Sequence, residues 1–276
     1  MDSTISFNDF LLFEKQVFGE AFPIASYDPS LIRYGEYRFV LDELNLQPGT
    51  NVLDLGCEFN IFMQYLAYRG VRILGVDINP KVQRTINDLK HKVEKSTKAV
   101  LDLRFQQEDA TKLSLAPESV EAVIAVSSIE HMFSASGHGD QLAVASIARV
   151  LKRGGLAAIT VPMSNGVPFH ESPKGDARFA GPYRLYTPET LAARYLSNPE
   201  LEVVSLKYLA NSTPDVRFSQ MHFHRFWLQT LSAADRAKWH WVQPILASVF
   251  NPIIPAQEGD QRLETLNTAL ICLRKI

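Results

Sequence analysis

Two acidic residues stand where a nucleotide-like ligand would need them. Asp54 belongs to a short apolar strand, 52–55, that runs into a tight turn at Gly56. Asp77 ends the next apolar segment, 71–76, and follows Gly56 by 21 residues. At about this distance, nucleotide-binding folds place an acid that accepts hydrogen bonds from ribose hydroxyls. The spacing therefore indicates a site for a nucleoside-containing ligand.

The elements around these acids explain how they could be positioned. An amphipathic helix is predicted after the turn, because Ile61, Phe62, Tyr65 and Leu66 share one face. The N–H groups at the start of such a helix are free to bind a ligand. A further apolar strand, 120–126, has the character of a central strand covered on both faces. Residues 127–131 follow at its carboxyl end, where open α/β sheets bind ligands.

Five segments between Asn51 and Pro162 resemble the class I S-adenosylmethionine (SAM)-dependent methyltransferases. In order, they read V-L-D-L-G-C, G-V-D-I-N-P, Q-E-D-A-T-K-L, S-S-I-E-H-M and I-A-R-V-L-K-R-G-G-L-A-A-I-T-V-P. The resemblance implies SAM as the cofactor. It also implies cofactor contacts from the first loop and from the strand ends, namely Asp54, Gly56, Cys57, Glu58, Asn60, Asp77, Ile78, Asp109, Ala110 and Ser127.

The first loop departs from the family pattern. The family usually has D-x-G-x-G-x-G, and here Glu58 and Asn60 replace the second and third glycines. Asn60 is compatible with the loop because asparagine tolerates a left-handed backbone and caps helices well. Two interpretations of Glu58 stay open: the loop has shifted, or its carboxylate faces the cation of SAM. In the family, the acid matching Asp109 accepts a hydrogen bond from the adenine amino group.

His131 is the candidate catalytic residue. The methyl group of SAM is already activated, so a base is needed only for a weak nucleophile such as a hydroxyl. The resemblance places His131 near that methyl group, and the alternative is that it only shapes the loop. Some quinone O-methyltransferases bind a metal through a Glu-His pair and an acid three residues earlier. Ser127 stands at that earlier position, so we predict no metal site.

The resemblance implies an α/β fold: a Rossmann-like, seven-stranded, mostly parallel sheet in the order 3-2-1-4-5-7-6, with helices on both faces. Residues 1–47 are predicted as an N-terminal helical cap. Residues 48–210 and 262–276 are predicted as the SAM-binding core, and 211–261 as a helical insertion before the last strand. The insertion holds all three tryptophans, which fits either a lid over the acceptor site or a homodimer interface.

The acceptor pocket is predicted from polar and aromatic residues outside the core motifs. In the resembled family, helices N-terminal to the core, like those predicted in residues 1–47, help to shape the acceptor pocket. A long irregular stretch, 162–186, is more often functional than idle. His222 and His224 have an i, i+2 spacing that points them to different sides of a helix, so they are pocket candidates and not a metal pair. The predicted pocket residues are Arg33, Tyr34, Tyr37, His170, Tyr183, His222 and His224.

Composition limits the partners. The chain of 276 residues is 46% hydrophobic and has a net charge of −2, with a pI near 6.4. It offers no basic footprint for nucleic acid, so we expect a small-molecule acceptor. Its two cysteines form no disulfide framework, which fits a cytoplasmic location. We expect no signal peptide and no transmembrane segment.

Two other classes remain open. A non-catalytic SAM-binding or regulatory protein that kept the fold is favoured by Glu58 and Asn60. A nicotinamide-dependent oxidoreductase would share the topology, but the first loop lacks the G-x-G-x-x-G glycines and no Tyr-x-x-x-Lys signature is present. A direct measurement of SAM binding would separate these readings.

Overall fold

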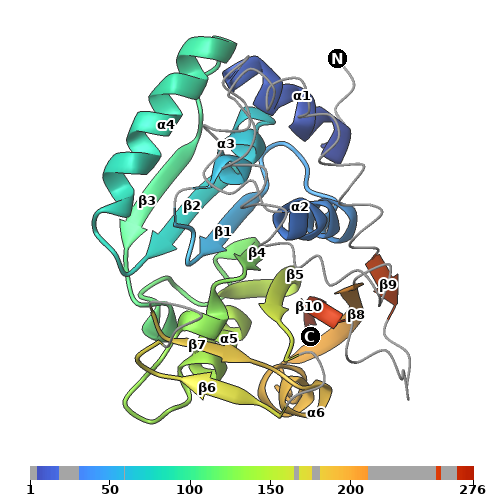
Figure 1. Cartoon of the computed structure of the whole chain (residues 1–276). Helices are drawn as coiled ribbons and strands as arrows, with labels where there is room; N and C mark the ends of the chain where they lie inside the picture. Colours follow the sequence, from blue (N-terminus) through green and yellow to red (C-terminus); the bar gives the residue numbers. More distant parts are fainter. Residues whose placement is uncertain are drawn as a thin grey trace.

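A computed structural model describes residues 5–18, 31–58, 60–164, 168–175, 181–210, 253–255 and 266–276. Its main feature is an eight-stranded sheet in the order β3-β2-β1-β4-β5-β10-β8-β9 (Figure 1). The strands are β1 Asn51–Leu55, β2 Arg72–Asp77, β3 Leu103–Gln107, β4 Val120–Val126, β5 Leu151–Pro162, β8 Leu201–Ala210, β9 Ile253–Pro255 and β10 Leu266–Lys275.

The pairing confirms the predicted fold. Strands β3, β2, β1, β4 and β5 are parallel, whereas β10 lies antiparallel between β5 and β8. With β8 as the sixth strand and β10 as the seventh, this is the order 3-2-1-4-5-7-6. The short strand β9 adds an eighth strand at the edge beside β8. It lies within the segment predicted as a helical insertion, so that prediction is wrong at 253–255.

Helices cover both faces of the sheet because side chains alternate along the strands. On one face, Val52 and Ile73 share a core with α1 Phe7–Phe18, α2 Leu31–Leu44, α3 Ile61–Tyr68 and α4 Val82–Thr97. On the other face, Leu53 and Val123 pack with α5 Gly139–Val150, α6 Pro188–Leu191 and the π-helical turn Ala192–Leu196. The predicted N-terminal cap therefore belongs to the same core as α3 and α4.

Two predicted boundaries need correction. The apolar spacing predicts a helix from about Gln141 to Lys152 that stops at Arg153-Gly154-Gly155. The helix α5 instead ends at Val150, because Leu151 already has an extended backbone and begins β5, so the predicted stop lies inside that strand. The stretch 162–186 is also more regular than predicted, because β6 His170–Ser172 and β7 Tyr183–Leu185 pair as an antiparallel hairpin.

The sequence predicts helix caps at Ser6 and Thr187, and the structure confirms both. The Ser6 hydroxyl accepts from the Asp9 N–H (3.3 Å) and caps α1. Thr187 caps α6, with Thr190 completing a capping box. The caps that the sequence predicts at Asp28-Pro29 and Ser232–Asp235, and the helical insertion 211–261 apart from 253–255, lie outside the described residues. In the part of the chain described, no helix is long and apolar enough to span a membrane.

Candidate functional site

The turn after β1 requires glycine at position 56. Gly56 has a φ of +66°, and a Cβ there would lie 2.7 Å from Cβ of Ser128. Its N–H donates to the carbonyl of Val76 (2.8 Å), which ties the turn to the end of β2. A side chain at this position would therefore meet both backbone strain and a clash.

Glu58 takes the backbone conformation that a glycine would favour. Its φ is +44°, in the left-handed region. Its N–H donates to Oδ2 of Asp77 (3.1 Å), and the Asn79 N–H donates to Oδ1 (2.8 Å). Two backbone donors therefore orient the Asp77 carboxylate, one from the turn after β1 and one from the segment after β2. Glu58 thus adopts the left-handed backbone that glycine would favour and adds a carboxylate to the turn.

Asn60 connects the first loop to Asp54. The Asn60 side chain accepts from the Met63 N–H (2.8 Å), which confirms the predicted helix cap. Its amide donates to the Cys57 carbonyl (2.8 Å) and to Oδ2 of Asp54 (3.2 Å). Burial raises the pKa of Asp54 to about 7, although the hydrogen bond from Asn60 opposes that shift.

A cavity of about 470 Å³ opens at the carboxyl ends of β1, β2 and β4. The residues predicted for the cofactor that line it are Gly56, Glu58, Asp77, Ile78, Asp109, Ala110 and Ser127. His131 lines it as well, with Met132 and Phe133 beside it. Residues from four separate segments of the chain therefore meet in one cavity.

The wall formed by Ile78 and Asp109 suits a purine ring. Ile78 is 68% exposed and lines the cavity, so it offers an uncovered apolar surface. Oδ1 of Asp109 accepts from the N–H and the hydroxyl of Thr111 (2.9 and 2.7 Å). Partial burial would raise the pKa of Asp109, but the hydrogen bonds from Thr111 and the proximity of Lys112 hold it below its usual value. Asp109 is thus a charged acceptor.

A second cavity of about 180 Å³ continues from the first. Both are lined by Arg33, Gly56, Glu58 and Ser127, so they adjoin at these residues. Asp54, Cys57 and Asn60 line the second cavity, so all ten residues predicted for the cofactor border one space or the other. Of the predicted acceptor-pocket residues, Arg33, Tyr34 and Tyr37 also line the second cavity.

The N-terminal cap is attached to this site through Glu36. Its carboxylate is fully buried, and Oε2 accepts from Arg33 (2.7 Å). Oε1 accepts from the hydroxyls of Ser127 and Thr160, both at 2.6 Å. Ser127, at the end of β4, has a left-handed φ of +43°. Helix α2 therefore helps to fix the strand end that borders both cavities.

Glu14 places an acid of a different kind in the second cavity. Its side chain is 1% exposed and accepts from the Tyr34 hydroxyl (3.0 Å). Burial raises the pKa of Glu14 to about 8, and the hydrogen bond from Tyr34 offsets only part of that shift. At neutral pH this carboxyl group therefore carries a proton.

His131 projects from the 3₁₀ turn Ile129–His131 that follows β4. Its Nδ1 lies 2.6 Å from the Pro182 carbonyl oxygen, and its Nε2 lies 3.8 Å from Oε1 of Glu130. The Glu130 side chain is 3% exposed, and its Oε2 has no hydrogen-bond partner among the described residues. Burial raises the pKa of Glu130 to about 7, with His131 opposing the shift.

The remaining predicted acceptor residues lie elsewhere. In the β6–β7 hairpin, Nε2 of His170 lies 3.0 Å from the Tyr183 hydroxyl, and neither residue is among those that line the two cavities. His222 and His224 lie outside the described residues. The described ranges contain no group of three or more His, Cys, Asp or Glu side chains arranged to hold a metal ion.

Comparison with known proteins identifies the class of domain. Residues 53–159 match a family model described as a methyltransferase domain. A SAM-dependent Diels-Alderase from Talaromyces variabilis is 30% identical over 139 residues, which cover 50% of this chain and 43% of that protein. The chain spans less than half the length of the curated relatives it matches.

Solved structures share the fold at low sequence identity. The [4+2]-cyclase SpnF superposes with a TM-score of 0.58 at 17% identity, covering 88% of this chain and 82% of that one. The geranyl diphosphate C-methyltransferase from Streptomyces coelicolor A3(2), solved with S-adenosyl-L-homocysteine, gives 0.56 at 15% identity, covering 88% and 76%. Residues 53–159 thus match a methyltransferase domain, and the chain shares the fold of solved SAM-dependent methyltransferases, so SAM is the cofactor that the motifs and this match both indicate.

The residues present fit that cofactor. The left-handed turn at Gly56 and Glu58 keeps the backbone close to the joined cavities. Asp77 and Asp109 line the larger cavity with carboxylate side chains, and Arg33 lines both cavities where they adjoin. The motifs did not reveal Glu14 and Glu36, which lie outside them. For Glu14, the sequence did contain a signal: an acidic residue interrupts the apolar helix face between Phe10 and Val17.

Proposed function

We propose that this protein transfers the methyl group of SAM to an O, N or C nucleophile of a small-molecule acceptor by direct in-line displacement. The observation that carries the proposal is the pair of joined cavities, which all ten predicted cofactor residues line at the carboxyl edge of the sheet. Bound SAM would supply an activated methyl group on its sulfonium, so the protein has mainly to align that group with the acceptor.

Each end of the joined cavities suits one part of the cofactor. Asp77 would accept from the ribose hydroxyls, and Asp109 from the adenine amino group beside Ile78. The smaller cavity brings Arg33 together with the acids Glu14, Asp54 and Glu58. Such a lining suits a group that carries both charges, as the ammonium and carboxylate of a methionine tail do. The Glu58 carboxylate would stabilise the positive charge of the sulfonium.

His131 is the residue that would receive a proton from a hydroxyl acceptor. A carbonyl oxygen can only accept, so the contact with Pro182 requires a proton on Nδ1. Nε2 then keeps its lone pair and can act as the base. Glu130 lies 3.8 Å from that nitrogen and would stabilise the imidazolium that forms. An acceptor of higher nucleophilicity would need no base, and His131 would then only shape the cavity.

The relatives favour a second candidate function. Two of the proteins that resemble this chain, the Diels-Alderase and the [4+2]-cyclase, are named for cyclisation and not for methyl transfer. A protein of this kind would bind SAM as part of its site and rearrange a small molecule without consuming the methyl group. That activity refines the earlier alternative of a SAM-binding protein without methyl transfer, and the replacements at positions 58 and 60 are compatible with it.

One experiment separates these functions. The purified protein is incubated with SAM labelled at its methyl group and with a small-molecule extract of the source organism. Methyl transfer predicts label in a small product and formation of S-adenosyl-L-homocysteine, and both should fall in the His131→Ala variant. A new small-molecule product that carries no label would support cyclisation. Calorimetry showing no binding of SAM, or preferential binding of NADP, would reject both proposals.

A further inference from the structure

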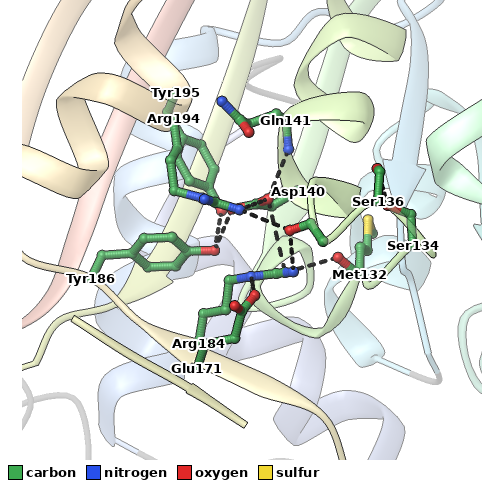
Figure 2. Close-up of polar contacts among 11 residues, drawn as sticks. Met132, Ser134, Ser136, Asp140, Gln141, Glu171, Arg184, Tyr186, Arg194 and Tyr195 are labelled. Carbon is green, nitrogen blue, oxygen red and sulfur yellow. Dashed lines mark hydrogen bonds and ion pairs between the residues drawn. The ribbon is translucent and has the colours of Figure 1, made fainter. Parts of the chain in front are cut away.

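A buried arginine in the β6–β7 hairpin holds the loop that follows His131. Arg184 is fully buried in β7, and Figure 2 shows its guanidinium directed at this loop. It donates to the carbonyl of Met132 (2.8 Å) and to the carbonyl of Gly137 (3.3 Å). The guanidinium carbon also lies 3.7 Å from the ring centre of Phe133. Arg184 thus contacts both ends of the segment 132–137, and Arg194 also donates to the Gly137 carbonyl (3.3 Å).

This loop is part of the cofactor site. Met132 and Phe133 line the larger cavity together with His131, so movement of the loop would change the cavity wall. The hydroxyls of Ser134 and Ser136 lie 2.9 Å apart and brace the loop tip. Arg184 itself lines neither cavity. Any influence that it has on the reaction therefore acts through the loop.

The residue that immediately precedes β7 also contacts the imidazole of His131. The carbonyl of Pro182, two residues before Arg184, is the oxygen that lies 2.6 Å from Nδ1. A carbonyl partner on one ring nitrogen determines which nitrogen keeps its lone pair. Where β7 sits relative to the turn 129–131 therefore decides whether Nε2 is available. Arg184 is the residue that joins β7 to the segment after that turn.

Charge compensation alone does not explain the position of Arg184. The buried carboxylate of Asp140 is already bound by Arg194, which donates from two nitrogens at 2.6 Å each. Tyr186 donates a further hydrogen bond to Asp140 (3.0 Å). Arg184 stands 3.9 Å from Asp140 and makes its short ionic contact with Glu171 (2.6 Å) instead. Its remaining donors serve the loop carbonyls.

We propose that Arg184 is a positioning residue that holds the cofactor wall at Met132 and Phe133 and fixes the tautomer of His131 in which Nε2 is unprotonated. This proposal rests on the proposed role of His131 as the base. Its structural part, however, is measurable without turnover, so failure of one can be told from failure of the other.

The test compares Arg184→Lys with Tyr195→Phe as a matched control. Tyr195 belongs to the same network, because its hydroxyl donates to Tyr186 (2.8 Å), but it does not contact the loop. Calorimetry measures the Kd for SAM, and ¹⁵N NMR at pH 8 reports which nitrogen of His131 is protonated. The His131→Asn variant assigns the His131 signals.

We expect wild type and Tyr195→Phe to show a protonated Nδ1, an unprotonated Nε2 and the same Kd. Arg184→Lys should show a mixture of tautomers and a Kd raised several-fold. With an identified acceptor, its kcat should fall 10- to 100-fold, on the order of the loss that a misplacement of about 1 Å causes. A folded Arg184→Lys protein with the wild-type tautomer and Kd would overturn the proposal.

A second variant covers the case in which Arg184→Lys does not fold. Glu171→Gln removes the charge that fixes Nε of Arg184, and the Glu171 side chain is 33% exposed, so folding is expected to survive. The same changes in tautomer and Kd should appear at smaller size. If Arg184→Lys does not fold and Glu171→Gln keeps the wild-type tautomer and Kd, Arg184 contributes only to stability.

Discussion

Two regions of the molecule bury carboxyl groups, and the pKa of these groups is shifted in opposite directions in the two regions. Along the cavities, Glu14 accepts from a phenol and Asp54 from an amide, and burial raises the pKa of both. In the network beside β7, Asp140 accepts from Arg194 and Tyr186. Burial alone would raise the pKa of Asp140, but these partners hold it below its usual value.

The comparison separates acids that maintain the fold from acids placed for a ligand. A buried charge with a guanidinium partner is stable as an ion and gains nothing from a ligand. An acid that holds a proton in a cavity can ionise when a cationic group enters, because the ligand then replaces the missing partner. On this basis we infer that Asp140 maintains structure, whereas Glu14 and Asp54, which line the smaller cavity, are candidates for ligand contact.

The largest effect is expected from Asp140→Ala. The substitution would leave the partly buried guanidinium of Arg194 without its anion, and loss of one partner of a buried ion pair costs up to about 3–5 kcal/mol. In a domain of this size, that corresponds to a fall in Tm of about 10 °C. Scanning calorimetry measures it at pH 7. A fall no larger than that of Tyr195→Phe would show that the network does not depend on the ion pair.

Asp77→Ala should weaken the binding of SAM without destabilising the fold. Buried ligand hydroxyls would lose a charged acceptor, at a cost of about 2 kcal/mol, or roughly a 30-fold increase in Kd. Isothermal titration measures the Kd, and the thermal unfolding of the free protein is the control. Undiminished affinity would remove Asp77 from the cofactor site.

Glu14→Gln should change how stability depends on pH. Because the pKa of Glu14 is raised from 4.5 to about 8, its protonated form favours the native state below pH 4.5. That advantage is lost as the pH rises through 8, since the unfolded chain then gains from ionisation. The variant should therefore match wild type near pH 4.5 and have a Tm several degrees higher at pH 8. Equal pH profiles would contradict the assignment.

Glu58→Gln gives the smallest expected effect and tests the unusual first loop. If the carboxylate faces the sulfonium, the Kd for SAM should rise several-fold, because a partly solvated charge pair contributes about 1 kcal/mol. The Kd for a neutral analogue without the sulfonium charge should change less. Glu58→Gly should not improve binding over wild type. Equal losses for both ligands would make Glu58 a structural residue of the turn.

Local patterns determined much of the fold. Alternating and continuous apolar runs predicted the strands, and the caps at Ser6, Asn60 and Thr187 were readable because capping involves residues only three apart. The hairpin of β6 and β7 was missed because each strand is three residues long. Periodicity cannot be recognised over so few positions.

The motifs also marked the residues of the candidate site, since each stands at the end of a predicted strand and parallel strands end at one edge. Only the tertiary structure joined them to residues without a motif. Glu36 meets Ser127 and Thr160 from 91 and 124 positions away, and Arg184 meets Met132 from 52 positions away. Whether a buried acid is ionised depends on such partners. The sequence alone therefore predicted the class of domain and the candidate cofactor residues, while packing decided which buried acids have a cationic partner and which side chains lie against the turn of His131.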